Sequence, residues 1–153
     1  MAKQLLFIDF GASSLGSSSF PIEVAWSAED GSIESCLISP KGIIGWTDWD
    51  DYAESDVHKV SRQQLDDEGK TPLWVASRMN EALKGKVLLS NAVMYDWDWC
   101  DSLFKAASLR MEFKIGDALH VFGRHLIFDE ELFNSKTDTA TSEKDKSTSM
   151  DWS

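Results

Sequence analysis

Two aspartates lie where predicted buried strands end, a place where carboxylates can do chemistry. Asp9 closes the apolar run 5–9, and Asp96 follows the apolar run 86–90 by a few residues. Mixed α/β sheets bind ligands at the carboxyl ends of their strands, and paired carboxylate oxygens suit Mg²⁺ or Mn²⁺. Each residue also has an ordinary structural interpretation, a turn or cap for Asp9 and a helix N-cap for Asp96. If the two strands are neighbours, the sequence predicts a divalent metal site at this edge.

The elements that must position these aspartates are short. Residues 5–9, 21–27 and 32–39 read as strands of an antiparallel meander, with a Glu-Asp-Gly turn before the third. Capping signals predict helices starting after Ser61 and Thr71, then a strand over 86–90 and a helix over 97–107. Residues 111–115 favour a fifth strand, with Asp117 capping a final helix. This order predicts an α/β fold, a mixed five-stranded sheet flanked by helices.

The composition limits the classes of function. Fifteen Lys and Arg against 26 Asp and Glu give a net charge of −11 in 153 residues, and the pI is about 4.6. Proteins that coat nucleic acid non-specifically need a basic surface, so this class is excluded, although a bound divalent metal could supply positive charge locally. No apolar run approaches the roughly 18 residues that a membrane span needs. The start has no signal-peptide pattern, so we expect a cytoplasmic protein.

The composition changes along the chain. Residues 134–153 are almost entirely polar, which predicts a disordered tail after a folded domain over residues 3–133. Residues 46–57 are acidic and aromatic and read as a solvated loop with one short helix. Cys36 and Cys100 have too few companions for a disulfide scaffold or a zinc site, so both read as buried free thiols.

Three segments resemble the DEDD-type 3′–5′ exonucleases, a ribonuclease H-like family related to the proofreading subunit of bacterial DNA polymerase. The segment from Phe7 to Leu15 with Pro21 to Trp26 is similar to the first motif of this family, Val57 to Arg62 to its His-Gly-Ile-Ser/Thr segment, and Ser90 to Trp99 to its second acidic motif. The segments occur in the family's order and cover most of residues 3–133. The resemblance implies a ribonuclease H-like fold and hydrolysis at two divalent ions, Mg²⁺ or Mn²⁺, held by four carboxylates.

Carried over residue by residue, the resemblance makes Asp9 the first metal ligand and Asp96 the third. The chain departs from the family at two places. Position 11 is Gly where the Asp-x-Glu pattern has its second carboxylate, and the final His/Asp motif has no clean counterpart. His125 and Glu130 have the spacing of that final motif, but we expect the chain to diverge before the family's last helix.

These departures leave several hypotheses open. The chain is a metal-dependent exonuclease acting on 3′ ends of single-stranded DNA or RNA, or a catalytically inactive pseudo-nuclease that binds nucleic acid or, through its acidic surface, a protein partner. A third hypothesis is an altered copy of an active relative. Trp97 and Trp99 are candidates for stacking on single-stranded bases, with aromatic packing as the alternative.

Overall fold

The first three strands form the predicted antiparallel meander. They are β1 (Leu6–Ala12), β2 (Pro21–Ser27) and β3 (Ile33–Leu37). In β1 and β2 buried and more exposed residues alternate, as expected for strands that turn one face to a core. Gly31 adopts a φ of 89° in the turn between β2 and β3, a conformation that glycine reaches without strain. The computed structural model describes residues 5–51 and 60–120.

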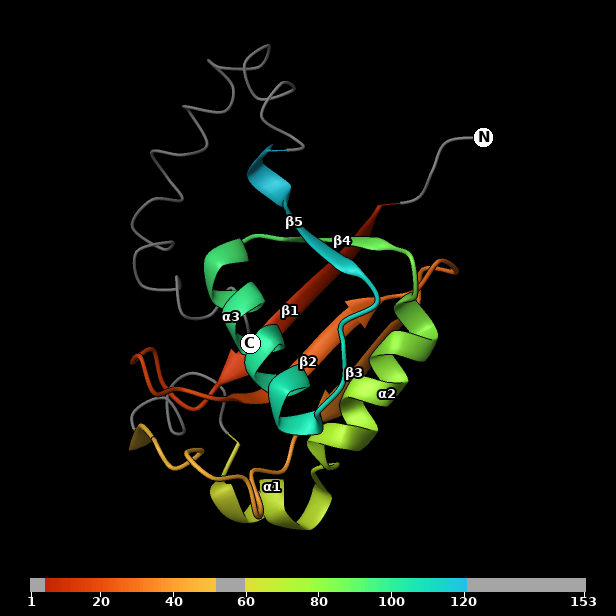
Figure 1. Ribbon diagram of the computed structural model, residues 1–153. Helices are drawn as coiled ribbons and strands as arrows, with labels where there is room; N and C mark the ends of the chain where they lie inside the picture. Colours follow the sequence, from red (N-terminus) through yellow and green to blue (C-terminus); the bar gives the residue numbers. More distant parts are fainter. Residues whose placement is uncertain (1–4, 52–59, 121–153) are drawn as a thin grey trace.

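The remaining elements complete a mixed sheet (Figure 1). They are α1 (Arg62–Glu68), α2 (Pro72–Leu83), β4 (Val87–Ser90), α3 (Val93–Ala107) and β5 (Lys114–Asp117). The strand order is β3-β2-β1-β4-β5, with β4 parallel to β1 and β5 parallel to β4. The predicted α/β architecture, including β4 beside β1, is therefore confirmed.

Side-chain caps start two helices where the sequence predicts them. The Ser61 hydroxyl accepts a hydrogen bond from the Gln64 amide at 3.0 Å, at the start of α1. The Thr71 hydroxyl accepts one from the Trp74 amide at 3.1 Å, with Pro72 in the first turn of α2. Each cap satisfies an amide that the helix leaves without an internal partner.

Several predicted boundaries were wrong. Strand β1 covers Leu6–Ala12, not 5–9, so Asp9 lies inside the strand and is not a turn or cap residue. Helix α3 begins at Val93, not at Trp97, and β5 covers 114–117, not 111–115. The shift in β5 has a tertiary cause, because the Asn80 side chain holds residues 110–112 as a loop: its amide nitrogen donates to the Arg110 carbonyl, and its oxygen accepts from the Glu112 amide. The predicted cap is present, since Asp117 accepts from the Leu119 amide at 2.9 Å and residues 118–120 are helical.

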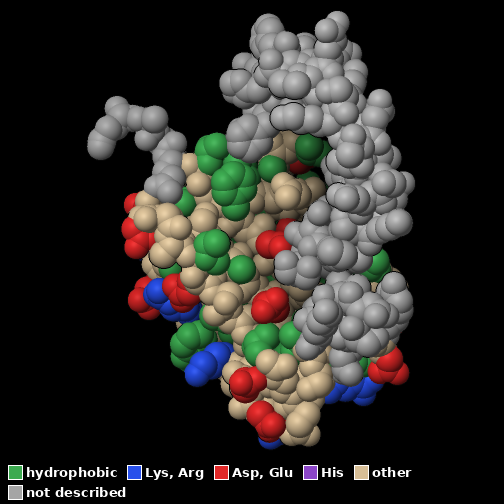
Figure 2. Space-filling view, turned by 180° about the vertical axis from the view of Figure 1, so that it is seen from behind, with side chains coloured by type: hydrophobic (Ala, Val, Ile, Leu, Met, Phe, Trp, Pro, Cys, Tyr) green, Lys and Arg blue, Asp and Glu red, His purple; other side chains and the backbone are tan. Residues whose placement is uncertain are grey.

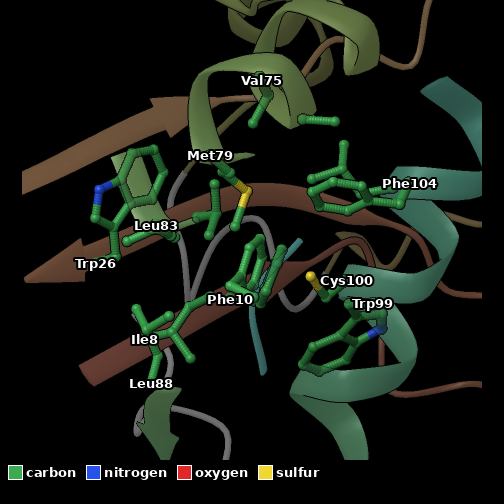
Figure 3. Close-up of a cluster of buried hydrophobic side chains, with 14 of the residues drawn as sticks. Ile8, Phe10, Trp26, Val75, Met79, Leu83, Leu88, Trp99, Cys100 and Phe104 are labelled. Atoms are coloured by element: carbon green, nitrogen blue, oxygen red, sulfur yellow. The ribbon is translucent and has the colours of Figure 1, made fainter. Parts of the chain in front are cut away.

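Helices α2 and α3 cover one face of the sheet, and the main core lies between (Figure 3). Phe10 and Trp26 from the sheet, Met79 from α2, and Cys100 and Phe104 from α3 are all buried there. Burial of such side chains stabilises the fold by about 1.5–3 kcal/mol each. Cys100 is buried as predicted, whereas Cys36 is half-buried. Within the described ranges, no helix is long and apolar enough to cross a membrane.

Candidate functional site

Asp9 lies on the sheet face that turns away from α2 and α3. Side chains alternate along β1, so Phe10 points into the core while Phe7 and Asp9 point to the other face. Asp9 is half-buried and borders a hollow of about 390 Å³, which Phe7, Ala25, Leu89 and Asn91 also line. The structure thus places Asp9 at the open surface of the sheet, where a ligand could reach it.

Asp96 is enclosed instead. It lies in the first turn of α3, and its side chain is 1% exposed. One carboxylate oxygen accepts a hydrogen bond from the Phe10 amide at 3.3 Å, and the other accepts one from the Ser90 hydroxyl at 2.5 Å. Burial raises the pKa of the Asp96 carboxyl to about 6, although both hydrogen bonds act in the opposite direction. The predicted N-cap role is wrong, since the N-cap residue is Ala92, which makes no side-chain cap.

The two aspartates therefore share one end of the sheet but occupy different environments. The Asp96 carboxylate reaches the amide of the residue directly after Asp9 because β4 ends there, leaving that edge of β1 unpaired. However, Asp96 does not line the hollow that Asp9 borders. The hydrogen bonds of Asp96 connect α3 to β1 and β4, whereas Asp9 faces the hollow on the open side of the sheet.

A third carboxylate, which the sequence analysis did not single out, lies near position 11. Glu23 on β2 is the direct cross-strand partner of Gly11, and Ala25 is the partner of Asp9. Directly paired residues of antiparallel strands project to the same face, so Glu23 lies on the face that carries Asp9. Burial raises the pKa of the Glu23 carboxyl. Only the strand register identifies this relation, and register is not visible in the motif itself.

These residues do not make up a two-ion centre. Among residues 5–51 and 60–120, no three His, Cys, Asp or Glu side chains gather in a way that could hold a metal ion. Asp96 already accepts two hydrogen bonds in a closed environment, and Gly11 contributes no ligand atom. His125 and Glu130, the candidates for the final motif, lie outside the described residues. The described part of the chain therefore does not fit the metal set that the resemblance implies, and we derive no hydrolytic step through it.

The two tryptophans of α3 differ in their availability for stacking. Trp99 is 3% exposed and its indole nitrogen donates to the Ser19 hydroxyl at 2.9 Å, so it is a core residue and the stacking hypothesis for it is wrong. Trp97 is 47% exposed and lies one helical turn from the exposed Met94. Only the helical phase of α3 distinguishes the two residues, which is why the local sequence did not.

The described part of the acidic segment is attached to the domain. The Ser14 hydroxyl donates to the Asp48 carboxylate at 2.5 Å, and the Asp50 amide donates to the Ser13 carbonyl at 3.0 Å. Trp46 stacks on Phe20 with 5.4 Å between ring centroids. Residues 46–50 form a loop as predicted, but they are partly buried beside the loop after β1 and are not fully solvated. Residues 52–57 lie outside the described residues.

Solved structures of exonuclease I are similar in fold to this chain. The product-bound structure of exonuclease I has a TM-score of 0.60 and 16% identity, over 76% of this chain and 30% of that one. The zinc ion bound form of the Escherichia coli exonuclease I–ssDNA complex has a TM-score of 0.59 and 15% identity, over 76% of this chain and 28% of that one. A structure of SSB/exonuclease I with the inhibitor CFAM has a TM-score of 0.60 and 16% identity, over 76% of this chain and 29% of that one.

These likenesses establish an exonuclease-like, ribonuclease H-like α/β fold, as the sequence predicts. The chain spans less than a third of the length of these proteins. Neither a family model nor a curated protein matches it.

Proposed function

We propose that this domain binds single-stranded nucleic acid at the carboxyl ends of β1 and β4 without hydrolysing it. The observation that carries the proposal is the enclosure of Asp96, whose two carboxylate oxygens are held by Phe10 and Ser90 at 1% exposure. A carboxylate in this position holds α3 against β1 and β4 through these hydrogen bonds and is not presented to a metal ion. On β1, the strand that also carries Asp9, Gly11 provides no side chain where the family has its second carboxylate.

Three features support nucleic acid as the ligand. The fold is similar to part of Escherichia coli exonuclease I, and one of the similar solved structures is its complex with ssDNA. The hollow beside Asp9 is bordered by the exposed ring of Phe7, and Trp97 is exposed on α3, whose first turn follows β4. Exposed aromatic rings are sequence-tolerant stacking surfaces for single-stranded bases. Because the net charge is −11, affinity must come from local features and not from the whole surface.

A second candidate function is metal-dependent 3′–5′ exonuclease activity of the DEDD type. It is favoured by the outward position of Asp9 and by the spacing of His125 and Glu130, which together with Asp96 would hold Mg²⁺ or Mn²⁺. The ions would activate water and stabilise the leaving oxygen. The enclosure of Asp96 and the glycine at position 11 make this the less favoured candidate.

One experiment separates the two candidates. A 5′-labelled single strand, as DNA and as RNA, is incubated with the protein and Mn²⁺, with EDTA and with the Asp9→Asn variant in parallel, while anisotropy reports binding. We expect binding at low salt and intact strands. A ladder shortening from the 3′ end that disappears in both controls would establish the exonuclease instead. Absence of binding to either strand, with and without Mn²⁺, would refute the proposal.

The stacking role of Trp97 has a matched control on α2. Trp97 and Trp74 are 47% and 46% exposed, so their replacement by alanine removes similar exposed area. Loss of a base-stacking ring costs about 1–3 kcal/mol, so Trp97→Ala should weaken oligonucleotide binding roughly 5- to 150-fold. Trp74→Ala should leave the dissociation constant unchanged. Equal effects of the two variants in an anisotropy titration would show that Trp97 does not stack on bases.

A further inference from the structure

We infer that a basic hollow at the amino ends of β4 and β5, formed by Lys86, Arg110 and Lys114, binds the phosphate backbone of the strand whose bases lie at the Asp9 end. This inference rests on the proposed function and adds a second contact region to it. The hollow measures about 470 Å³. It holds three of the 15 Lys and Arg residues of a strongly acidic chain.

The hollow has a fixed framework. The Lys114 amide donates to the Lys86 carbonyl at 2.9 Å, and the Gly85 amide donates to the Glu112 carbonyl at 2.8 Å. The half of the hollow that carries Arg110 is held by Asn80, which is 8% exposed and makes the two loop hydrogen bonds described above. The backbone positions of all three cations are therefore set by buried or strand-type hydrogen bonds.

Positive charge is in excess at this place. Glu112 also lines the hollow, but the Lys84 ammonium lies 3.7 Å from its carboxylate, and Lys86 lies 3.2 Å from Glu29. Within each of these two pairs the positive and the negative charge cancel. Arg110 and Lys114 make no ion pair with any other residue in the described part of the chain and are both exposed.

The sheet register connects the hollow to the Asp9 end across apolar residues, of which Val87 and Phe7 are exposed and Leu89 is buried. Lys114 pairs with Val87; two residues further along, Gly116 pairs with Leu89, which pairs with Phe7 of β1. Asp9 lies two residues beyond Phe7. At about 3.3 Å per residue and about 4.8 Å per strand, the path from Lys114 to Asp9 is roughly 16 Å. One short oligonucleotide can therefore reach both regions.

The surface along this path is suited to bases. Phe7 is 42% exposed and Val87 49% exposed, and hydrophobic side chains gather on this face of the sheet in the view from behind (Figure 2). A run of cations beside exposed aromatic and apolar side chains is the combination by which single-stranded nucleic acids are bound without sequence preference. A simple inorganic anion would use the cations but not the apolar surface.

The test compares salt dependence in two variants of equal charge. Arg110→Gln with Lys114→Gln removes the two cations in excess, and Lys41→Gln with Lys105→Gln removes two exposed cations elsewhere. Circular dichroism and thermal melts first establish that both variants fold. Affinity for a labelled dT oligonucleotide is then measured by anisotropy between low and moderate salt. Each lost phosphate contact lowers the magnitude of the slope of log K against log salt by about 0.7 for single strands. The slope of the Arg110/Lys114 variant should therefore fall by about 1.4, and that of the control variant should change little.

The outcomes separate this inference from the proposed function. If the unaltered protein binds the oligonucleotide but both variants lose the same slope, the attraction is general and the basic hollow is not a site. If the unaltered protein does not bind, the proposed function itself fails. If inorganic phosphate at equal ionic strength competes as well as a second oligonucleotide does, the hollow is an anion site without a nucleic-acid path.

Discussion

Asp96 makes stability depend on pH in a direction opposite to that of most carboxylates. Its folded pKa of about 6 lies above the unfolded value of about 3.9, so the folded state binds the proton more tightly. The stabilisation from this group is complete below about pH 4 and is lost as the pH rises through 6, in total on the order of 2–3 kcal/mol. At neutral pH the ionised, buried Asp96 therefore lowers the free energy of unfolding.

Replacing Asp96 by the neutral isostere tests this directly. In Asp96→Asn the side-chain oxygen can still accept from the Phe10 amide, and the amide group can donate to the Ser90 hydroxyl. We expect the variant to be at least as stable as the parent at pH 7.5 and to gain no stability on lowering the pH to 4.5, by urea unfolding. Asp98→Asn, an exposed change on the same helix, is the control. A uniform loss of stability at all pH values would mean that the charged form is what the site requires.

Gly11 lies between the carboxylates of Asp9 and Glu23. A glutamate at position 11 should create a metal site but lower the stability of the metal-free protein. In Gly11→Glu the new side chain faces Glu23 directly across the strands and lies two residues from Asp9. Like charges in this relation are destabilising, so we expect a lower Tm without metal. Three carboxylates on one face would bind Mn²⁺, so millimolar Mn²⁺ should raise the Tm of this variant but not of the parent. Gly11→Gln controls for side-chain size; an equal Mn²⁺ response in it would contradict the expected geometry.

The end of α3 carries local backbone strain that can be relieved. Ser108 has φ 55° and ψ 38° as the residue that ends the helix, and its amide donates to the Lys105 and Phe104 carbonyls. A side chain in this left-handed conformation is strained, whereas glycine is not. Ser108→Gly should therefore raise the free energy of unfolding by about 0.5–1 kcal/mol. Ser102→Gly, inside the same helix, should lower it by a similar amount. Urea unfolding of both gives the comparison, and destabilisation by Ser108→Gly would refute this account.

What the sequence predicted well was governed by local rules. The caps at Ser61 and Thr71 and the meander depend on residues close in the chain, and the structure reproduces them. The early start of α3 and the late start of β5 depend on contacts from elsewhere, such as the Asn80 side chain that holds residues 110–112. The enclosure of Asp96 and the pairing of Gly11 with Glu23 likewise depend on contacts between residues distant in the sequence. For this reason the motif identified the right end of the sheet but not the environment of its carboxylates.

The two faces of the sheet differ across the whole domain, and this difference organises the proposed function. One face is buried under α2 and α3, while the opposite face carries Phe7, Asp9 and Val87. Basic residues at the amino ends of β4 and β5 and carboxylates at the carboxyl end of β1 lie at opposite ends of that face. The phosphates of a single strand would be attracted to the basic end and kept away from the carboxylates, so that its bases lie toward the Asp9 end; this difference orients the strand along the sheet.

The composition of the chain also predicts which part of it contributes to stability. Residues 134–153 contain few apolar side chains, so they cannot bury enough surface to offset the entropy lost on ordering. Deleting them should leave the Tm within about 2 °C, since a shift of that size corresponds to less than 1 kcal/mol for a domain of this length. Calorimetry of the full chain and of the chain ending at Phe133 makes the comparison, with oligonucleotide binding as a second readout. The deletion also removes net negative charge, so binding should be unchanged or tighter. A drop of many degrees would show that the segment packs on the domain, and the open face of the sheet would then be the first place to look for it.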